Sequence, residues 1–194
     1  MSIYARKLSI WPRFQDKLPY IFASTFNLKK MPDIRQTLLI AATPERIYHA
    51  LTTSEGLSAW WTPNVHAAGE TGTIARFLFG NDYVKQMQID SLDPAQKVKW
   101  KCVGGDQEWI GTTIIFTLLQ SANAALLETN PEIRGQIEQN PAPAATMLHF
   151  QHNDWAGYTS TFAECSYTWG QFLRSLKLYC ETGKGKPWPA QHSL

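Results

Sequence analysis

The sequence has no apolar stretch long enough to cross a membrane. Its longest strand-like apolar run is IIFTLL, residues 114–119, whereas a membrane-spanning helix needs about 18 to 20 apolar residues. Cysteine is scarce as well, with three in 194 residues and no C-x-x-C pair. We therefore expect no membrane span. We expect the cysteines to be small buried apolar residues in a reducing cytoplasm, not disulfide partners.

The signatures of several enzyme classes are missing too. There is no G-x-S-x-G motif, and no cysteine stands beside a histidine, so a serine or cysteine nucleophile has no support. The GKG triplet at residues 183–185 follows the last predicted helix, whereas a phosphate-binding loop precedes a helix. We expect no cofactor.

The net charge of +2 hides an uneven distribution. Residues 1–30 carry six Lys and Arg against one acidic residue, Asp16, so the rest of the chain has a net charge of −3. A nucleic-acid-binding protein should present a basic face, and we expect no nucleic-acid partner. Residues 1–35 show no sustained hydrophobic period and contain three prolines. We interpret them as an N-terminal extension, which could be extra translated sequence before Met31, an ordered packing arm or a targeting peptide.

From residue 36 onward the sequence predicts an α+β order of elements. Residues 36–41 are typical of a strand, and Thr43-Pro44-Glu45 begins a helix that ends near Thr52. Thr43 can cap this helix, Pro44 suits its first position and Glu45 meets the positive end of its dipole. A second short helix is predicted over residues 54–60.

Several short antiparallel strands are predicted next, with turn-forming residues between them. They are TGTIARFLF, VKQMQID, KVKWKCV and WIGTTIIFTL within residues 72–118, and TMLHFQH at residues 146–152. In KVKWKCV apolar residues alternate with lysines, which predicts one buried and one solvated face of the sheet. Residues 120–144 interrupt the strands as an insertion in a hairpin, with a short helix that reaches Ile137. The insertion is either a surface decoration or a flap over a pocket.

The last predicted element is one long helix. Residues 161–164 have the form of a capping box, and apolar residues then recur at spacings of three, four and seven as far as Cys180. Gly183 is expected to end this helix. About twenty residues make a helix of roughly 30 Å, enough to cross a sheet.

Five segments in this order resemble the START-like (SRPBCC) superfamily. They are IAATPERIYHALTTSEGLSAWW, VKW, EWIGTTIIFTL, LHFQHNDW and YTWGQFLRSLKLYCETGKGKPW. The most similar branch looks like the bacterial proteins related to the activator of the Hsp90 ATPase, which are grouped with polyketide cyclases. The resemblance covers residues 36–188 apart from the insertion, and leaves 189–194 as a tail. It implies an α+β helix-grip fold, in which a curved antiparallel sheet of about six to seven strands wraps around the long C-terminal helix, with two short helices after the first strand.

Aromatic residues make up 12% of the sequence, with eight tryptophans, and some should wall a cavity between sheet and helix. Packing in a core is the alternative for each of them. Trp60 and Trp61 are adjacent, and neighbours on a regular element point in different directions. We therefore expect them not to share one core: one should plug the core beneath the short helices, and the other should face the cavity entrance. The expected cavity residues are Trp60, Trp61, Phe77, Trp100, Trp109, Phe116, Phe150, Trp169 and Phe172.

Polar candidates for chemistry are few. His149 and His152 are three residues apart, so a strand places them on opposite faces, and we expect no metal site. His152 is expected to be a hydrogen-bonded structural residue; a general acid or base in the cavity is the alternative. Glu108 and Asp154 are the other weak catalytic candidates. Arg76 would anchor an anion if it faced inward, but an outward, solvated charge is expected.

Three functions agree with these features. The first is a cytoplasmic START-like domain that binds a small, largely apolar molecule without catalysis. The second is a small cyclase- or hydrolase-type enzyme that uses His152, Asp154 or Glu108. The third is an interaction module like the Hsp90 co-chaperone, which we favour least because the eukaryotic co-chaperone's companion domain is missing. A homodimer is compatible with each.

Overall fold

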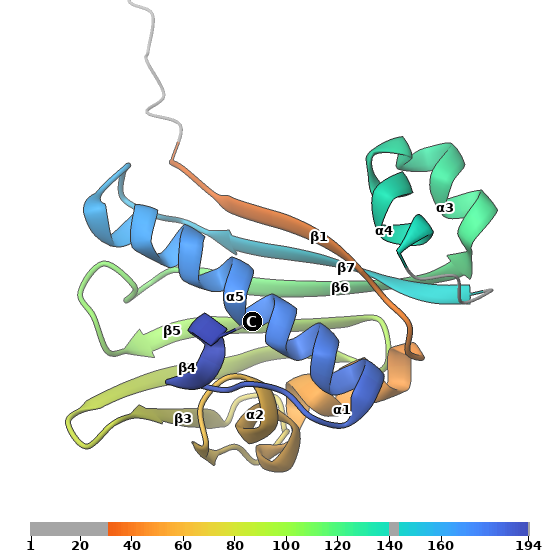
Figure 1. The fold of residues 1–194 in the computed structure, drawn as a ribbon. Helices are drawn as coiled ribbons and strands as arrows, with labels where there is room; N and C mark the ends of the chain where they lie inside the picture. Colours follow the sequence, from red (N-terminus) through yellow and green to blue (C-terminus); the bar gives the residue numbers. More distant parts are fainter. Residues whose placement is uncertain (1–30, 140–143, 194) are drawn as a thin grey trace, which may run out of the picture. The chain divides into compact units, whose positions relative to one another are not determined.

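Figure 1 shows the computed structural model of the protein, which describes residues 31–139 and 144–193. Seven strands form one antiparallel sheet in the order β1-β7-β6-β5-β4-β3-β2, and α5 crosses one face of it. The strands are β1 (Ile34–Ile40), β2 (Asn64–His66), β3 (Ile74–Phe79), β4 (Tyr83–Asp93), β5 (Lys97–Gly104), β6 (Thr113–Ala122) and β7 (Ala144–Asn153). The helices are α1 (Pro44–Thr52), α2 (Ser54–Trp60), α3 (Asn123–Thr129), α4 (Arg134–Glu138) and α5 (Ser160–Thr182), with 3-10 turns η1 (Pro131–Ile133) and η2 (Ala190–Ser193).

The predicted helix-grip arrangement is confirmed. Most of the predicted N-terminal extension, residues 1–30, lies outside the described part of the chain. Strand β2 was not predicted, because three residues at a sheet edge give too short a pattern. None of the helices within the described ranges is long and apolar enough to cross a membrane.

The two short helices follow β1 through local capping. The Thr43 side chain accepts a hydrogen bond from the Arg46 amide with Pro44 in the first turn, as predicted. Thr53 then ends α1 and caps α2, because its side chain accepts from the amide of Gly56. A Cβ atom at Gly56 would lie 2.6 Å from the Ala50 Cα, so this glycine lets the two helices pack closely.

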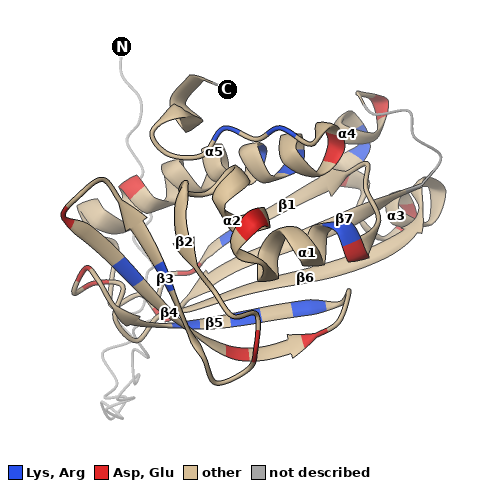
Figure 2. Ribbon diagram, turned by 90° about the horizontal axis from the view of Figure 1, so that it is seen from below, with Lys and Arg blue, Asp and Glu red and all other residues tan. Residues whose placement is uncertain are grey.

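The sheet has one buried and one solvated face. In β5, Val98, Trp100 and Cys102 are buried, while Lys97, Lys99 and Lys101 alternate with them on the opposite face. Figure 2 shows these basic residues in blue along β5. The alternation predicted from the sequence is therefore confirmed.

Several predicted boundaries differ from the structure, and two of these differences have a local cause. Strand β6 begins at Thr113, and the preceding residues form a turn in which the Asp106 carboxylate accepts from the Glu108 amide and Gly111 has a φ of 94°. Helix α5 begins at Ser160, since Thr159 is the residue whose side chain accepts from the amide of Phe162. The predicted end at Gly183, with a φ of 81°, is confirmed.

The segment between β6 and β7 packs against the face of the sheet opposite α5. Pairing of β6 with β7 continues to Ala122 and Ala144, so both strands extend into the predicted insertion. A separate apolar cluster joins this segment to the sheet, and its members alternate along β1 and β7 with residues of the main core. The cluster contains Leu39, Leu126, Ile133, Ala145 and Met147.

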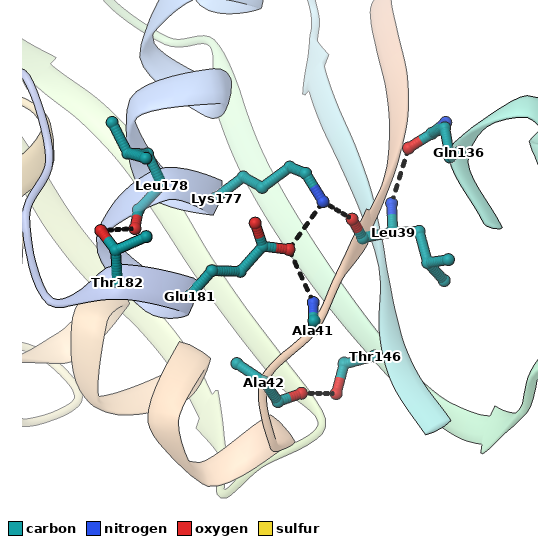
Figure 3. Close-up of polar contacts among 9 residues, drawn as sticks. All are labelled: Leu39, Ala41, Ala42, Gln136, Thr146, Lys177, Leu178, Glu181 and Thr182. Carbon is teal, nitrogen blue, oxygen red and sulfur yellow. Dashed lines mark hydrogen bonds and ion pairs between the residues drawn. The ribbon is translucent and has the colours of Figure 1, made fainter. Parts of the chain in front are cut away.

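Side chains, not another strand, cover part of the outer edge of β1 (Figure 3). Gln136 of α4 accepts from the Leu39 amide at 2.8 Å and donates to the Thr37 carbonyl at 3.2 Å. From α5, Lys177 donates to the Leu39 carbonyl and Glu181 accepts from the Ala41 amide. Because an open edge invites pairing with another chain, these four contacts close this stretch of it.

Candidate functional site

A cavity of about 310 Å³ lies between the sheet, α5 and the C-terminal segment. Its walls combine aromatic rings with a few polar side chains, and they come from the end of α2, β3, β4, the β5–β6 turn, α5 and the C-terminal segment. The lining residues are Trp61, Phe79, Tyr83, Lys85, Trp109, Glu164, Cys165, Thr168, Trp169, Phe172, Trp188, Gln191 and His192. None of the described residues of the β6–β7 segment is among them, so that segment does not cover this cavity.

The paired tryptophans lie at the end of α2. Both are buried, and their rings stack with centroids 5.8 Å apart and planes at 10°. The expectation that they could not share one core was wrong, because both belong to the main buried cluster; Trp60 is the last residue of α2 and Trp61 its C-cap. Trp60 packs beneath the short helices and donates to the Ala50 carbonyl at 2.9 Å, whereas Trp61 lines the cavity.

Four of the nine predicted cavity residues reach the cavity wall: Trp61, Trp109, Trp169 and Phe172. The other five are buried in the main core behind that wall: Trp60, Phe77, Trp100, Phe116 and Phe150. Trp61 connects the two groups, because its ring lies 4.3 Å from that of Phe77 and 5.3 Å from that of Trp169. Binding of a molecule by these residues stays a prediction.

Lys85 is the functional candidate that sequence reasoning missed. Its side chain is buried, with 8% of the residue exposed, and it lines the cavity. Its Nζ donates to Tyr83 Oη at 2.8 Å and lies 3.2 Å from the centre of the Trp109 ring, a cation–π contact. Burial lowers the pKa of Lys85 to about 8. Its position in β4 could have revealed it, because Lys85 lies two and four residues before the buried Met87 and Ile89 and therefore shares their inward face.

Tyr83 is the hydrogen-bonding partner of this lysine. Its Oη accepts from Lys85 Nζ and from the Asp106 amide at 3.3 Å. Burial raises the pKa of Tyr83 to about 12, so the phenol keeps its proton at neutral pH. In the part of the chain that the structure describes, no acceptor is bonded to that proton.

Two thiols lie near the lysine and remain neutral. Cys165 lines the cavity and accepts from Trp109 Nε1 at 3.1 Å, and Cys102 lies on the inward face of β5. Burial raises the pKa of both thiols above the ordinary value. All three cysteines are free, as the sequence predicted. Neither thiol therefore supplies a negative charge for Lys85.

His152 is buried in a hydrogen-bonded network outside the cavity lining. Trp169 Nε1 donates to its Nδ1 at 3.1 Å, and Nε2 lies 2.8 Å from Thr112 Oγ1. Burial lowers the pKa of His152 to about 3, so the ring is neutral and carries its hydrogen on Nε2. Thr112 extends this hydrogen-bonded network, because its hydroxyl donates to the Trp109 carbonyl. With both nitrogens bonded, this geometry matches the structural histidine that we expected.

The other catalytic candidates point elsewhere. Asp154 is exposed and accepts from the Thr113 hydroxyl at 2.7 Å. Glu108 is half-buried and accepts from the Thr159 hydroxyl, and Arg76 is exposed. None of them lines the cavity. Within residues 31–139 and 144–193, no three His, Cys, Asp or Glu side chains are grouped as metal ligands.

The C-terminal segment forms one wall. The Trp188 amide donates to the Trp61 carbonyl at 2.9 Å, and the Trp188 ring packs edge-on against Phe79. Gln191 lines the cavity with 2% exposed, and its Oε1 is buried without a partner among the described residues. Residues of the predicted tail thus contribute to the cavity, and no sequence pattern indicated this.

Comparisons with known proteins agree with the fold. The model of the family described as Activator of Hsp90 ATPase homolog 1-like protein matches residues 41–181. The solution structure of the Aha1 dimer from Colwellia psychrerythraea is 33% identical, with a TM-score of 0.64 over 80% of this chain and 100% of that chain. A Mesorhizobium loti protein (15% identity, TM-score 0.57, 75% of this chain and 94% of its own) has the same fold. DynU16, a putative protein in the dynemicin biosynthetic locus, also has this fold (20% identity, TM-score 0.58, 80% of this chain and 49% of its own). A comparison with curated proteins found no match.

Proposed function

The chain belongs to the family of Activator of Hsp90 ATPase homolog 1-like proteins, and on this premise we propose that its START-like domain binds a small, largely apolar molecule. The cavity between the sheet and α5 is the binding site. The observation that supports this is the space itself: about 310 Å³ is left open beside the half-buried side chains of Phe79, Thr168 and Trp188.

The cavity is only partly enclosed, so a molecule can enter it from the solvent and cover the side chains that line it. Small-molecule sites measure about 300–1,000 Å³ and are mostly apolar with a few polar groups. The cavity lies at the lower end of that range, which supports a compact ligand.

The enzyme alternative loses its support from geometry. Its three residues, His152, Asp154 and Glu108, do not converge on the cavity, whereas acid–base catalysis requires groups within hydrogen-bonding reach of a bound substrate. Binding without catalysis is therefore the function that we propose.

Filling the cavity tests this proposal. Thr168 lines the cavity from α5, whereas Ala163 lies exposed on the same helix. We expect Thr168→Phe to abolish binding of apolar compounds, as measured by calorimetry and by native mass spectrometry of the purified protein. Ala163→Phe adds a comparable ring outside the cavity and should bind as the wild type does. Equal binding by both variants would contradict the proposal.

We also infer a homodimer, because the relative from Colwellia psychrerythraea is described as a dimer and its whole length is covered by this chain. The closed stretch of the β1 edge argues against strand pairing there as the contact. Light scattering coupled to size exclusion should give twice the chain mass of 22.0 kDa. A mass that stays at one chain up to millimolar concentration would exclude this assembly.

A further inference from the structure

Resting on the proposed function, we infer that the ligand is an organic acid with a flat apolar body and a single carboxylate, which Lys85 Nζ and the Tyr83 hydroxyl bind in the cavity. The apolar body then lies against the half-buried aromatic rings of Phe79 and Trp188 in the cavity wall.

Lys85 is a buried cation that has no carboxylate as a counter-ion among the described residues. Only 8% of its surface is exposed. A buried charge is expensive unless it is paired and hydrogen-bonded. With a pKa of about 8 the side chain is still mostly protonated at neutral pH. A ligand anion would supply the missing charge.

None of the described ionisable groups that face Lys85 acts as its counter-ion. The thiols of Cys102 and Cys165 are neutral. Asp106 is exposed and its carboxylate accepts from the Glu108 amide. On the cavity lining, Glu164 and His192 are exposed. The groups that surround the amine on β4, β5, the β5–β6 turn, α5 and η2 are thus Tyr83, Cys102, Asp106, Cys165, Glu164 and His192.

Lys85 and Tyr83 can also donate hydrogen bonds to a ligand. An ammonium group has three N–H donors, and one of those of Lys85 is used by Tyr83 Oη. Tyr83 Oη already accepts two hydrogen bonds, so its own hydrogen is directed away from both donors. Lys85 and Tyr83 therefore offer donors side by side, and donors to a charged oxygen make the stronger class of hydrogen bond.

The cavity also restricts the charge and the shape of the ligand. One lysine balances one negative charge, so a monocarboxylate suits the site better than a phosphate dianion, which would leave excess charge buried. The half-buried rings of Phe79 and Trp188 meet edge-on at the cavity wall, with centroids 6.1 Å apart, and flat apolar bodies pack well against such aromatic faces.

A pair of probes with one ring system isolates the acid group. We would measure binding of 2-naphthoate and of 2-naphthalenemethanol to the full chain by calorimetry at pH 7. The wild type should bind the acid at least about tenfold more tightly than the alcohol, as expected for hydrogen bonds to a charged group. Lys85→Met should lose this preference while retaining its affinity for the alcohol. Tyr83→Phe, which keeps the ring, should reduce the preference in part.

The matched control is Lys101→Met, which removes an exposed lysine on the opposite face of the sheet. It should retain the full preference for the acid. Equal affinities of the wild type for both probes, or an unchanged preference in Lys85→Met, would overturn the inference and leave the proposed function standing. If neither probe binds at millimolar concentration, both the inference and the proposed function fail.

Discussion

At the scale of single residues, Lys85 combines burial with charge. Its pKa is lowered because the ammonium form has lost water on folding. The cation–π contact with Trp109 and the bond to Tyr83 offset only part of this loss. The ligand-free protein therefore keeps a destabilising group at its cavity, as is common for side chains that are retained for function.

We predict that Lys85→Met stabilises the ligand-free protein by about 1–3 kcal/mol at pH 7, since a fall in pKa from 10.5 to about 8 corresponds to roughly 3 kcal/mol. Between these pH values the unfolded chain holds a proton that the folded chain has lost, so wild-type stability rises with pH relative to the variant. The difference should thus be full below pH 8 and vanish near pH 10.5. Urea denaturation at several pH values measures it, and a less stable variant at pH 7 would contradict the prediction.

The lowered pKa of His152 gives a prediction for stability at acidic pH. Its folded pKa of about 3 lies below the ordinary value of 6.5. Below pH 6.5 the unfolded chain binds a proton that the folded chain refuses, so stability falls as the pH is lowered. Relative to His152→Gln, we expect the wild type to lose about 2 kcal/mol between pH 7 and pH 5. The imidazole NMR signals should stay those of a neutral ring at pH 5; a protonated ring there would disprove this account.

At the scale of elements, the sequence predicts what local chemistry determines. The start of α1 follows from Thr43 and Pro44, which act within one turn. The start of α5 was predicted two residues late because Thr159 and Thr161 can both cap a helix. The hydroxyl of Thr159 also donates to Glu108, from the turn before β6. That contact spans two distant segments, so no local pattern could show it.

The cavity was predictable in its chemistry but not in its position. Alternation along a strand tells which residues face inward, and it applies to Phe77 and Trp100 as well as to Lys85. Whether an inward ring meets α5 or open space depends on how far the helix fills the curve of the sheet. The contribution of Gln191 depends on where the C-terminal segment folds back. Both are properties of the tertiary structure.

The covered edge of β1 gives a prediction at this scale. Gln136→Ala removes two hydrogen bonds to the strand and leaves the Leu39 amide without its acceptor. We expect a loss of about 1–2 kcal/mol in the free energy of unfolding and faster hydrogen exchange at that amide. Gln139, exposed at the end of α4, provides the matched control. If Gln139→Ala has the same effect as Gln136→Ala, the edge contacts are not the cause.

At the scale of the whole domain, the cavity depends on segments that are far apart in the chain. Trp188, close to the C-terminus, bonds the backbone of Trp61 and packs on Phe79. The end of α2, the edge of the sheet and the C-terminal segment are held together at this point. The cavity therefore requires the domain to fold as one unit through residue 192.

We predict that Trp188→Ala weakens binding of 2-naphthoate by about tenfold, since the variant removes one aromatic wall. Calorimetry on the full chain measures the change. Tyr158→Ala removes an aromatic side chain that is 79% exposed and lies outside the cavity lining. It should bind as the wild type does. An equal loss of affinity in both variants would contradict a specific role of Trp188 in the binding site.

The tryptophan stack at the end of α2 also has an optical consequence. Trp60, Trp61 and Trp100 stack in series, with 5.8 Å between successive ring centres and planes within 10°. Tryptophan rings that are held in one tertiary packing arrangement contribute to near-ultraviolet circular dichroism, which is lost when the packing loosens. The middle ring of the series is also a wall of the cavity. The protein therefore carries its own spectroscopic reporter of occupancy, and titrations can be followed without an added label.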